Sequence, residues 1–310
     1  MSVPVMTHTV NDLLTAYEHD YLPAKAPTTQ YQQRRLYAWL RQQMGERALT
    51  DLTPAYLRAW RDTLSARYAP GTVLRYLHSL SGPLTAAVLD YEWLAENPLR
   101  KIRKPPGSPA RVRFLSDDER TRLLAACRVS RNPHLYAAVL LALSIGARKS
   151  QVLGLRWRDI DLARGLVRVP ASKRHAPRSL PLLGPVVAVL ARMSVGQSQE
   201  AWVFARHDGL RPILVDAAFA SACQRAGISG FRFHDLRHTC ASYLAMSGSS
   251  LPEIAEVLGH RSIVVTTRYV HLTAGHTRGV LARMADQFLA SLLLAATGTT
   301  LASVWLVGWT

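Results

Sequence analysis

Cysteine is scarce in this sequence and stands in no metal-binding or disulfide pattern. Only three cysteines occur among 310 residues, at Cys127, Cys223 and Cys240, and no two of them form a CxxC pair. An odd number of isolated cysteines argues against a disulfide framework and against a zinc site. We therefore expect a protein of the reducing cytoplasm.

Acidic residues are also few, and so is lysine. Asp and Glu total 21 against 38 Lys and Arg, which gives a formal net charge of +17, and only five of the 38 are lysine. This balance favours a polyanionic partner such as nucleic acid. Arginine binds phosphate through a planar two-pronged fork, which suits backbone contacts, although the same bias can reflect genome composition.

Charge is missing altogether from the last 23 residues, 288–310, a length that would cross a bilayer. Gly298 and the threonines around it interrupt the apolar run. We expect this apolar tail, residues 291–310, to pack against another subunit or against the protein itself, in preference to a membrane anchor or a disordered, sticky end. At the N-terminus no basic region precedes an apolar run, so no secretory signal is expected.

The length of the chain and its 48% hydrophobic content indicate two domains of ordinary size. Turn signals divide the first hundred residues into helical segments, and Thr53 with Pro54 forms a clear helix start. We predict a helical domain over residues 1–98, with helices at about 9–22, 28–44, 53–68 and 71–95.

A basic linker is predicted over residues 99–114. Paired prolines and a glycine mark an extended, solvated connection. Two interpretations remain open, a solvated hinge and a strap along a phosphate backbone, and the overall charge favours the strap. The candidate DNA-binding residues are its six basic side chains, Arg100, Lys101, Arg103, Lys104, Arg111 and Arg113.

The second domain, residues 115–290, should be mainly helical around a small antiparallel β-sheet. A capping box at Ser116 opens a helix at about 117–127, and Gly146 ends an apolar helix at about 133–144. Short apolar stretches with two turns predict the sheet within residues 159–182. From about 184 to 290 the pattern is helical again.

Six residues of this domain form a candidate catalytic set. Each alone has an ordinary interpretation, since a turn lysine is usually solvated and a tyrosine on an apolar helix is usually core. Together they offer five hydrogen-bond donors and one nucleophile, the tyrosine. The set is Arg148, Lys173, His234, Arg237, His260 and Tyr269.

Local signals predict how these side chains are held. His234 and Arg237 stand three apart at the head of a helix and share one face. His260 follows a helix that ends at Gly259, and we expect Tyr269 on the next helix, with Ser262 as its cap. No carboxylate cluster offers a metal site. A tyrosine attacking a phosphodiester would then have its transition-state charge met by fixed cations in place of Mg²⁺.

The residues resemble those of the tyrosine recombinases, or phage integrase family, over most of the chain. Lys173, five before Arg178 in the predicted hairpin, also fits the family pattern. The matching stretches are "NPLRKIRKP" at the domain junction, "SIGARKSQVLGLRWRDID", "FHDLRHTCASYLAMSG" and "LGHRSIVVTTRYVHL".

This resemblance implies an N-terminal helical core-binding domain and a C-terminal α+β catalytic domain that close around double-stranded DNA at a specific recombination site. It implies site-specific recombination for integration, excision or resolution of DNA, without cofactor or ATP. The expected assembly is a homo-oligomer, a dimer on one site and a tetramer in the synapse.

The resemblance also implies the residue roles. Tyr269 attacks the scissile phosphate to give a 3′-phosphotyrosine, while Arg148 and Arg237 grip that phosphate. His260 donates a hydrogen bond to it, Lys173 protonates the departing 5′-oxygen, and His234 helps to move the proton of the tyrosine.

One position departs from the family pattern, because Gln151 stands where an acidic residue is common. A neutral amide can orient its neighbours but cannot offset their charge. Three alternatives remain: a DNA-binding, architectural relative that no longer cuts, a type IB topoisomerase that religates within one duplex, and a basic RNA-binding module, which explains the charge but not the catalytic set.

Overall fold

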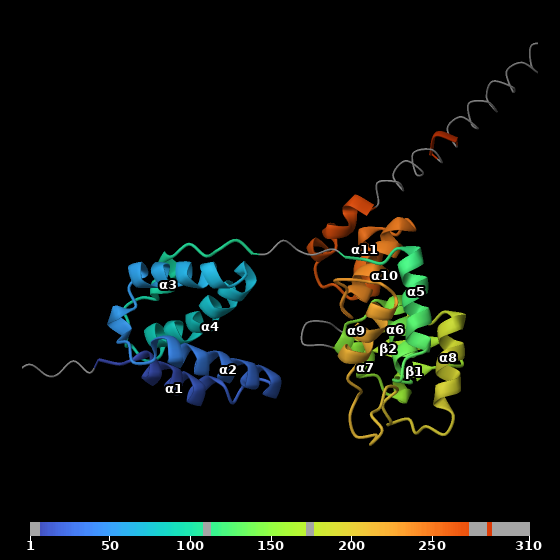
Figure 1. Ribbon diagram of the computed structural model, residues 1–310, viewed down its shortest axis with the longest axis horizontal. Coiled ribbons are helices and arrows are strands. Elements are labelled where there is room, and N and C mark those ends of the chain that lie inside the picture. The colour runs from blue at the N-terminus through green and yellow to red at the C-terminus, as the bar shows by residue number, and fades with distance from the viewer. Residues whose placement is uncertain (1–6, 108–112, 172–176, 273–283, 287–310) are drawn as a thin grey trace, which may run out of the picture. The chain divides into compact units, whose positions relative to one another are not determined.

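The computed structural model describes residues 7–107, 113–171, 177–272 and 284–286. The chain divides into two compact units, residues 1–110 and 111–310, each with its own core (Figure 1). In the part of the chain that is described, no helix is long and apolar enough to cross a membrane. The apolar tail predicted at 291–310 lies outside the described residues. Cys127, Cys223 and Cys240 are buried free thiols.

The first unit is a four-helix domain, and the four predicted helices are confirmed, except that the last ends at Leu89 and does not continue to residue 95 as predicted. Three of the helices begin with proline, whose missing N–H costs nothing at a helix start. Thr53 Oγ1 accepts from the Tyr56 N–H at 3.2 Å, the predicted cap. The elements are α1 (Val10–Tyr21), α2 (Pro27–Met44), α3 (Pro54–Arg67) and α4 (Pro70–Leu89), with 3₁₀ turns η1 (Leu49–Asp51) and η2 (Pro98–Lys101).

The core of the first unit extends into the predicted linker. Leu99 and Ile102, on and just after η2, are buried beside the leucines of α3 and α4. Their burial explains why the chain cannot leave this unit at residue 98, where we expected the linker to begin. From Arg103 to Gly107 the backbone forms no helix or strand.

The second unit combines helices with the predicted small antiparallel sheet, which has three strands. The strands are ordered β1-β2-β3, and Val167 pairs with both Ile160 and Leu180. Gly165, at φ 63°, makes the first turn. The elements are α5 (Asp117–Arg128), α6 (Leu135–Ile145), α7 (Lys149–Leu153), η3 (Trp157–Asp159), β1 (Ile160–Asp161), β2 (Leu166–Val169), β3 (Arg178–Pro181), α8 (Gly184–Ser194), α9 (Asp216–Arg225), α10 (Asp235–Met246), α11 (Leu251–Leu258), η4 (Ile263–Val265) and η5 (Thr267–Leu272).

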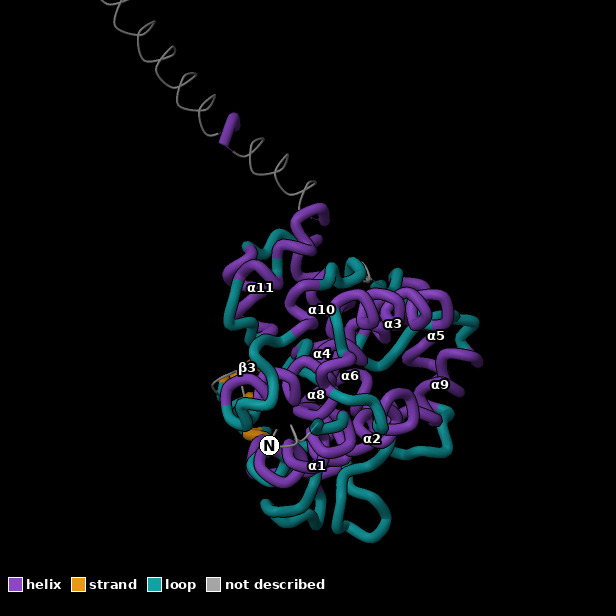
Figure 2. The backbone as a smooth tube through the Cα atoms, turned by 90° about the vertical axis from the view of Figure 1, so that its left-hand side faces the viewer, coloured by secondary structure: helices purple, strands orange, loops and turns teal. Residues whose placement is uncertain are grey.

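Helix α6 is the centre of this unit because it is apolar on every side. It packs against α5, α8 and α10 (Figure 1). Gly146 ends it in the left-handed conformation, and a Cβ there would lie 2.5 Å from Leu258 Cδ2 of α11. The glycine therefore lets the end of α6 approach α10 and α11 closely, and Figure 2 shows α10 beside α11.

The helical prediction for residues 184–290 is wrong between α8 and α9. Residues 195–215 form two isolated bridges, Arg156 with Trp202 and Ala205 with Pro212, and no helix. Gly196 and Gly209 adopt positive φ, a conformation that ends helices. Val203, Phe204, Ile213 and Val215 of this stretch are buried in the core of the unit, whereas Val195, Leu210 and Leu214 are exposed.

Candidate active site

Five of the six predicted catalytic residues line one cavity of about 700 Å³ in the second unit. They come from four places in the chain that α6, α10, α11 and η5 bring together. Lys173, the sixth, lies outside the described residues; in sequence it falls between β2 and β3. The five are Arg148, His234, Arg237, His260 and Tyr269.

Arg237 is held by the ends of two helices. Its side chain is buried, and Nη1 donates to the Gly146 and Leu258 carbonyls, each at 2.8 Å. These carbonyls end α6 and α11, where the helix dipole is negative and stabilises a cation. Burial, with Arg148 and Arg178 nearby, lowers the pKa of Arg237 to about 10, so it stays charged at neutral pH.

Arg148 precedes the short helix α7, as predicted, and Gln151 fixes its backbone. The Gln151 side chain is buried; Oε1 accepts from the Arg148 N–H at 3.3 Å and Nε2 donates to the Pro170 carbonyl at 3.0 Å. The amide thus connects Arg148 to the strand that leads to Lys173. A carboxylate could not donate the second bond, so the glutamine orients its neighbours by using both of its polar atoms.

His260 sits in the turn after α11, as predicted. Ser250 and Glu253 form a capping box at the start of α11, and Gly259 ends the helix in the left-handed conformation at φ 65°. His260 Nδ1 lies 2.8 Å from Thr266 Oγ1, and Thr266 is fully buried. That contact fixes the orientation of the ring within the cavity.

Tyr269 lies on a 3₁₀ segment, where we expected an ordinary helix. Ser262 stands before η4, but its side chain makes no capping hydrogen bond. Tyr269 is 1% exposed and packs with Ala241, Ile254 and Leu258. Burial raises the pKa of its hydroxyl, against the lowering effect of Arg268 and Arg237.

His238 is a residue of this cavity that the sequence set does not contain. Its Nδ1 lies 2.6 Å from the Tyr269 hydroxyl oxygen, and its ring stands at 90° to that of His234, with centroids 5.5 Å apart. Its position four after His234 places both histidines on one face of α10. That spacing was the available signal in the sequence.

Arg178, at the start of β3, is also absent from the sequence set; it does not line the cavity but lies beside Gly259 and near Arg148. Nε donates to the Val257 carbonyl at 3.1 Å, while Nη1 and Nη2 are buried and find no acceptor among the described residues. Burial, and then the charge of Arg148, lowers its pKa. Buried cationic donors without acceptors are costly, and an anion bound beside them would satisfy them.

Four of the six predicted DNA-binding residues are exposed to solvent. Arg100, Lys101, Arg103 and Lys104 are exposed, Lys101 being paired with Glu96. Arg111 lies outside the described residues.

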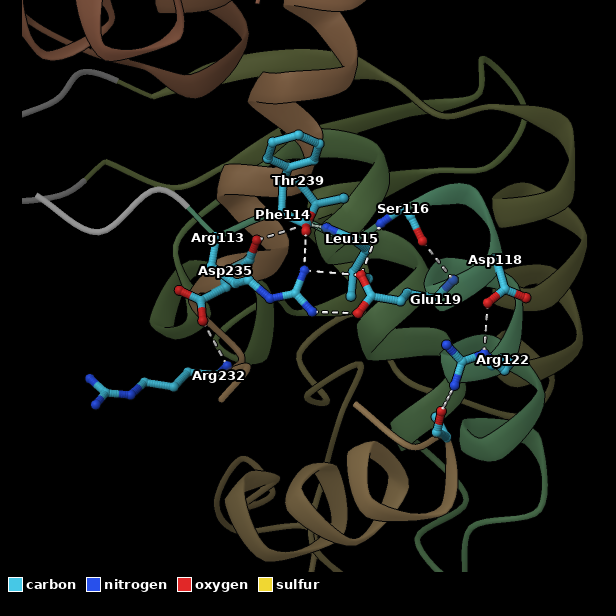
Figure 3. A network of polar contacts seen from close by, with 11 residues as sticks. Arg113, Phe114, Leu115, Ser116, Asp118, Glu119, Arg122, Arg232, Asp235 and Thr239 are labelled. Atoms are coloured by element: carbon cyan, nitrogen blue, oxygen red, sulfur yellow. Dashed lines mark hydrogen bonds and ion pairs between the residues drawn. The ribbon is translucent and has the colours of Figure 1, made fainter. Parts of the chain in front are cut away.

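Arg113 makes its polar contacts with other residues of the protein (Figure 3). Its guanidinium forms a two-pronged ion pair with Glu119 at the start of α5 and also donates to the Phe114 carbonyl. Its side chain is 28% exposed. The sequence could not distinguish this structural arginine from the exposed ones beside it.

A larger cavity, of about 1220 Å³, lies elsewhere in the second unit and contains none of the six residues. Among the residues that the structure describes, no three His, Cys, Asp or Glu side chains are grouped as a metal site. The cationic cavity is therefore the place where the described chain concentrates reactive groups.

Comparison with known proteins agrees with this geometry. The model of the phage integrase family matches residues 113–276, more than half of the chain, so the protein belongs to the phage integrase family. The integrase of Salmonella phage P22 is 30% identical over 222 residues, covering 67% of this chain and 56% of that protein. The shufflon-specific DNA recombinase of Escherichia coli is 32% identical over 237 residues, covering 74% and 60%. The chain thus spans little more than half the length of these relatives.

Solved structures share the fold. The Tn1549 transposon integrase, in complex with a circular intermediate DNA, superposes with a TM-score of 0.74 at 18% identity, covering 89% of this chain and 99% of that one. A lambda integrase dimer bound to a COC′ core site gives 0.71 at 19% identity, covering 85% and 77%. A mainly helical fold with a small antiparallel sheet is the architecture of these integrases.

Proposed function

We propose that this protein is a site-specific DNA recombinase that cleaves and rejoins DNA strands through a 3′-phosphotyrosine intermediate, without metal or ATP. The observation that carries the proposal is the cavity in which the Tyr269 hydroxyl lies among two arginines and two histidines of the predicted set. The names of the relatives, integrases and recombinases, support it.

Each side chain has a role in this reaction. The Tyr269 oxygen attacks the scissile phosphorus, while Arg148 and Arg237 bind the non-bridging oxygens on which negative charge increases. His260 donates a further hydrogen bond, and His234 assists the transfer of protons. Lys173 protonates the departing 5′-oxygen. Because the hydrogen bonds of Arg237 to the Gly146 and Leu258 carbonyls fix it before DNA arrives, little reorganisation is needed in the transition state.

The proposed partner is double-stranded DNA carrying a recombination site. The unit formed by residues 1–98 and the η2 turn would bind it as the core-binding domain, and residues 115–290 as the catalytic domain. The exposed cations Arg100, Lys101, Arg103 and Lys104, with Arg111, would follow the phosphate backbone. Lambda integrase forms a dimer on a core site and a tetramer on a Holliday junction. We propose the same assemblies here, acting in the cytoplasm, which the free thiols support.

The test is a covalent adduct on a nicked duplex that carries the recognition site. The nick releases the short 5′-hydroxyl strand after cleavage, so the protein–DNA ester accumulates and survives denaturation. We expect the native protein to give the adduct with EDTA present, and Tyr269→Phe to bind the same DNA without forming it.

Three results would each overturn the proposal. Normal binding by the native protein without an adduct would identify a DNA-binding, architectural relative. Adducts that only relax one duplex, with no joint molecules from two sites, would identify a topoisomerase. Cleavage that EDTA abolishes would identify a metal-dependent reaction.

A further inference from the structure

The hydroxyl of Tyr269 already has a partner in this structure, and it is not one of the predicted catalytic residues. His238 Nδ1 lies 2.6 Å from the hydroxyl oxygen, with the two ring centroids 6.1 Å apart. The pair joins α10 to η5, which pack against each other. No hydrogen bond between His234 and Tyr269 occurs among the described residues, and His234 is exposed where His238 is half-buried.

The direction of this hydrogen bond follows from the state of the imidazole. Burial, and then the nearby charges of His234, Arg268 and Arg237, lower the pKa of His238 to about 4, against a smaller raising effect of Asp235. The ring is therefore neutral at pH 7 and has one nitrogen free to accept. A phenol is a far stronger acid than a neutral imidazole N–H. The tyrosine thus donates to Nδ1.

We propose that His238 is the general base of strand cleavage, taking the proton of Tyr269 as its oxygen attacks the scissile phosphate. This inference rests on the proposed function. The O–H bond of Tyr269 breaks and its proton passes to His238 Nδ1. The phenolic oxygen bonds to phosphorus, the bond from phosphorus to the 5′-oxygen breaks, and that oxygen takes a proton from the acid assigned above to Lys173.

The return step balances the first. When a 5′-hydroxyl attacks the phosphotyrosine, the imidazolium of His238 gives its proton back to the departing phenolic oxygen. No proton is consumed over the cycle. The low basicity of His238 in the resting site does not prevent this role, because the proton transfer accompanies the bonding of the oxygen to phosphorus, and the bound phosphate adds negative charge that stabilises the imidazolium.

The first experiment replaces His238 by asparagine. The asparagine Oδ1 can accept the tyrosine hydrogen bond in nearly the place of Nδ1 but cannot take the proton, so His238→Asn keeps the positioning and removes the base. On the nicked duplex at pH 7 we expect DNA binding like that of the native protein and adduct formation about 10² to 10⁴ times slower. Native-like cleavage by His238→Asn would overturn the inference. Should that protein not bind DNA, His238→Gln takes its place.

The second experiment makes the nucleophile more acidic by placing 3,5-difluorotyrosine at position 269. In the His238→Asn protein we expect this substitution to restore most of the lost rate, because an acidic phenol needs no base. We also expect the rate of His238→Asn with ordinary tyrosine to rise about tenfold per pH unit, where the native rate is flat. A structural role for His238 predicts neither effect, and their absence would refute a base. If the native protein forms no adduct at all, the proposed function fails; if only these variant results differ, His238 alone is misassigned.

Discussion

His238 is a half-buried imidazole whose charged form the fold disfavours, and this gives the stability of the protein a defined pH dependence. Its pKa is lowered to about 4 from an ordinary value of 6.5, chiefly by burial. The unfolded chain therefore binds the proton more tightly than the folded one. Stability from this group is complete above about pH 6.5 and is lost as the pH falls towards 4.

Urea unfolding of the native protein and of His238→Asn at pH 7.5, 6 and 5 measures this effect. We expect the native protein to lose about 1 to 3 kcal/mol more than the variant over that range. Other acid-sensitive groups are common to both proteins and cancel in the difference. If the free energy of unfolding falls equally with pH in the two proteins, His238 has the same pKa in the folded and unfolded chains and this account is wrong.

Arg113 and Arg103 both belong to the predicted linker, yet replacing them by alanine should change the stability of the protein to different extents. Arg113→Ala removes the two-pronged contact with Glu119 and the donation to the Phe114 carbonyl, so we expect a loss of about 1 to 3 kcal/mol in the free energy of unfolding. The Arg103 side chain is exposed, and its alanine variant should change stability by less than about 0.5 kcal/mol. Equal thermal stability of the two variants would contradict this assignment.

The turn after α11 has little room for a side chain at Gly259. Gly259 adopts φ 65°, and a Cβ there would overlap the Arg178 guanidinium. Gly209 has a similar φ of 68° with nothing within 4 Å, so it provides a matched control. Both alanine variants should lose about 1 kcal/mol from backbone strain.

The difference between the two variants should appear in cleavage. In Gly259→Ala the Arg178 side chain must move, because it lies against the turn that also holds His260. We expect at least a tenfold slower adduct formation for Gly259→Ala, and native-like cleavage for Gly209→Ala. A Gly259→Ala protein that cleaves normally would show that neither Arg178 nor the turn needs its present position.

Local signals of sequence predicted the elements that depend on local chemistry. The capping box at Ser116, the helix start at Thr53 and Pro54 and the helix end at Gly259 are decided by neighbouring residues, and all are confirmed. The segment 195–215 was misjudged because four of its apolar residues, Val203, Phe204, Ile213 and Val215, pack into the core from irregular backbone, which no local signal shows. The 3₁₀ geometry around Tyr269 was likewise set by packing on α10.

The candidate site was predictable as a set of residues but not as an arrangement. The gathering of five residues in one cavity agrees with the sequence set, whereas the roles of those residues stay predictions. The contact of His238 with Tyr269 joins positions 31 apart in sequence, and only the packing of η5 on α10 reveals it. The same holds for Arg178, whose neighbours come from α11 and from the loop before α7.

For the whole molecule, the net charge of +17 predicts DNA affinity that falls steeply with salt. Each phosphate contact that is removed should reduce the slope of log K against log salt by about 0.9. Arg103→Ala combined with Lys104→Ala should therefore lower the slope by about 2, for specific and unrelated DNA alike. Fluorescence anisotropy between 50 and 300 mM KCl measures it. An unchanged slope would remove these two residues from the DNA-binding surface.

The hydrogen bonds of Arg237 to the Gly146 and Leu258 carbonyls influence which mutations accumulate first in a gene copy that is no longer selected for recombination. Loss of the Tyr269 hydroxyl would abolish strand cleavage and leave the fold intact. Loss of the Arg237 guanidinium would instead leave the Gly146 and Leu258 carbonyls without this donor and weaken the contact between the ends of α6 and α11. Gene copies that are selected for DNA binding but no longer for strand exchange should therefore lose Tyr269 early and retain Arg237.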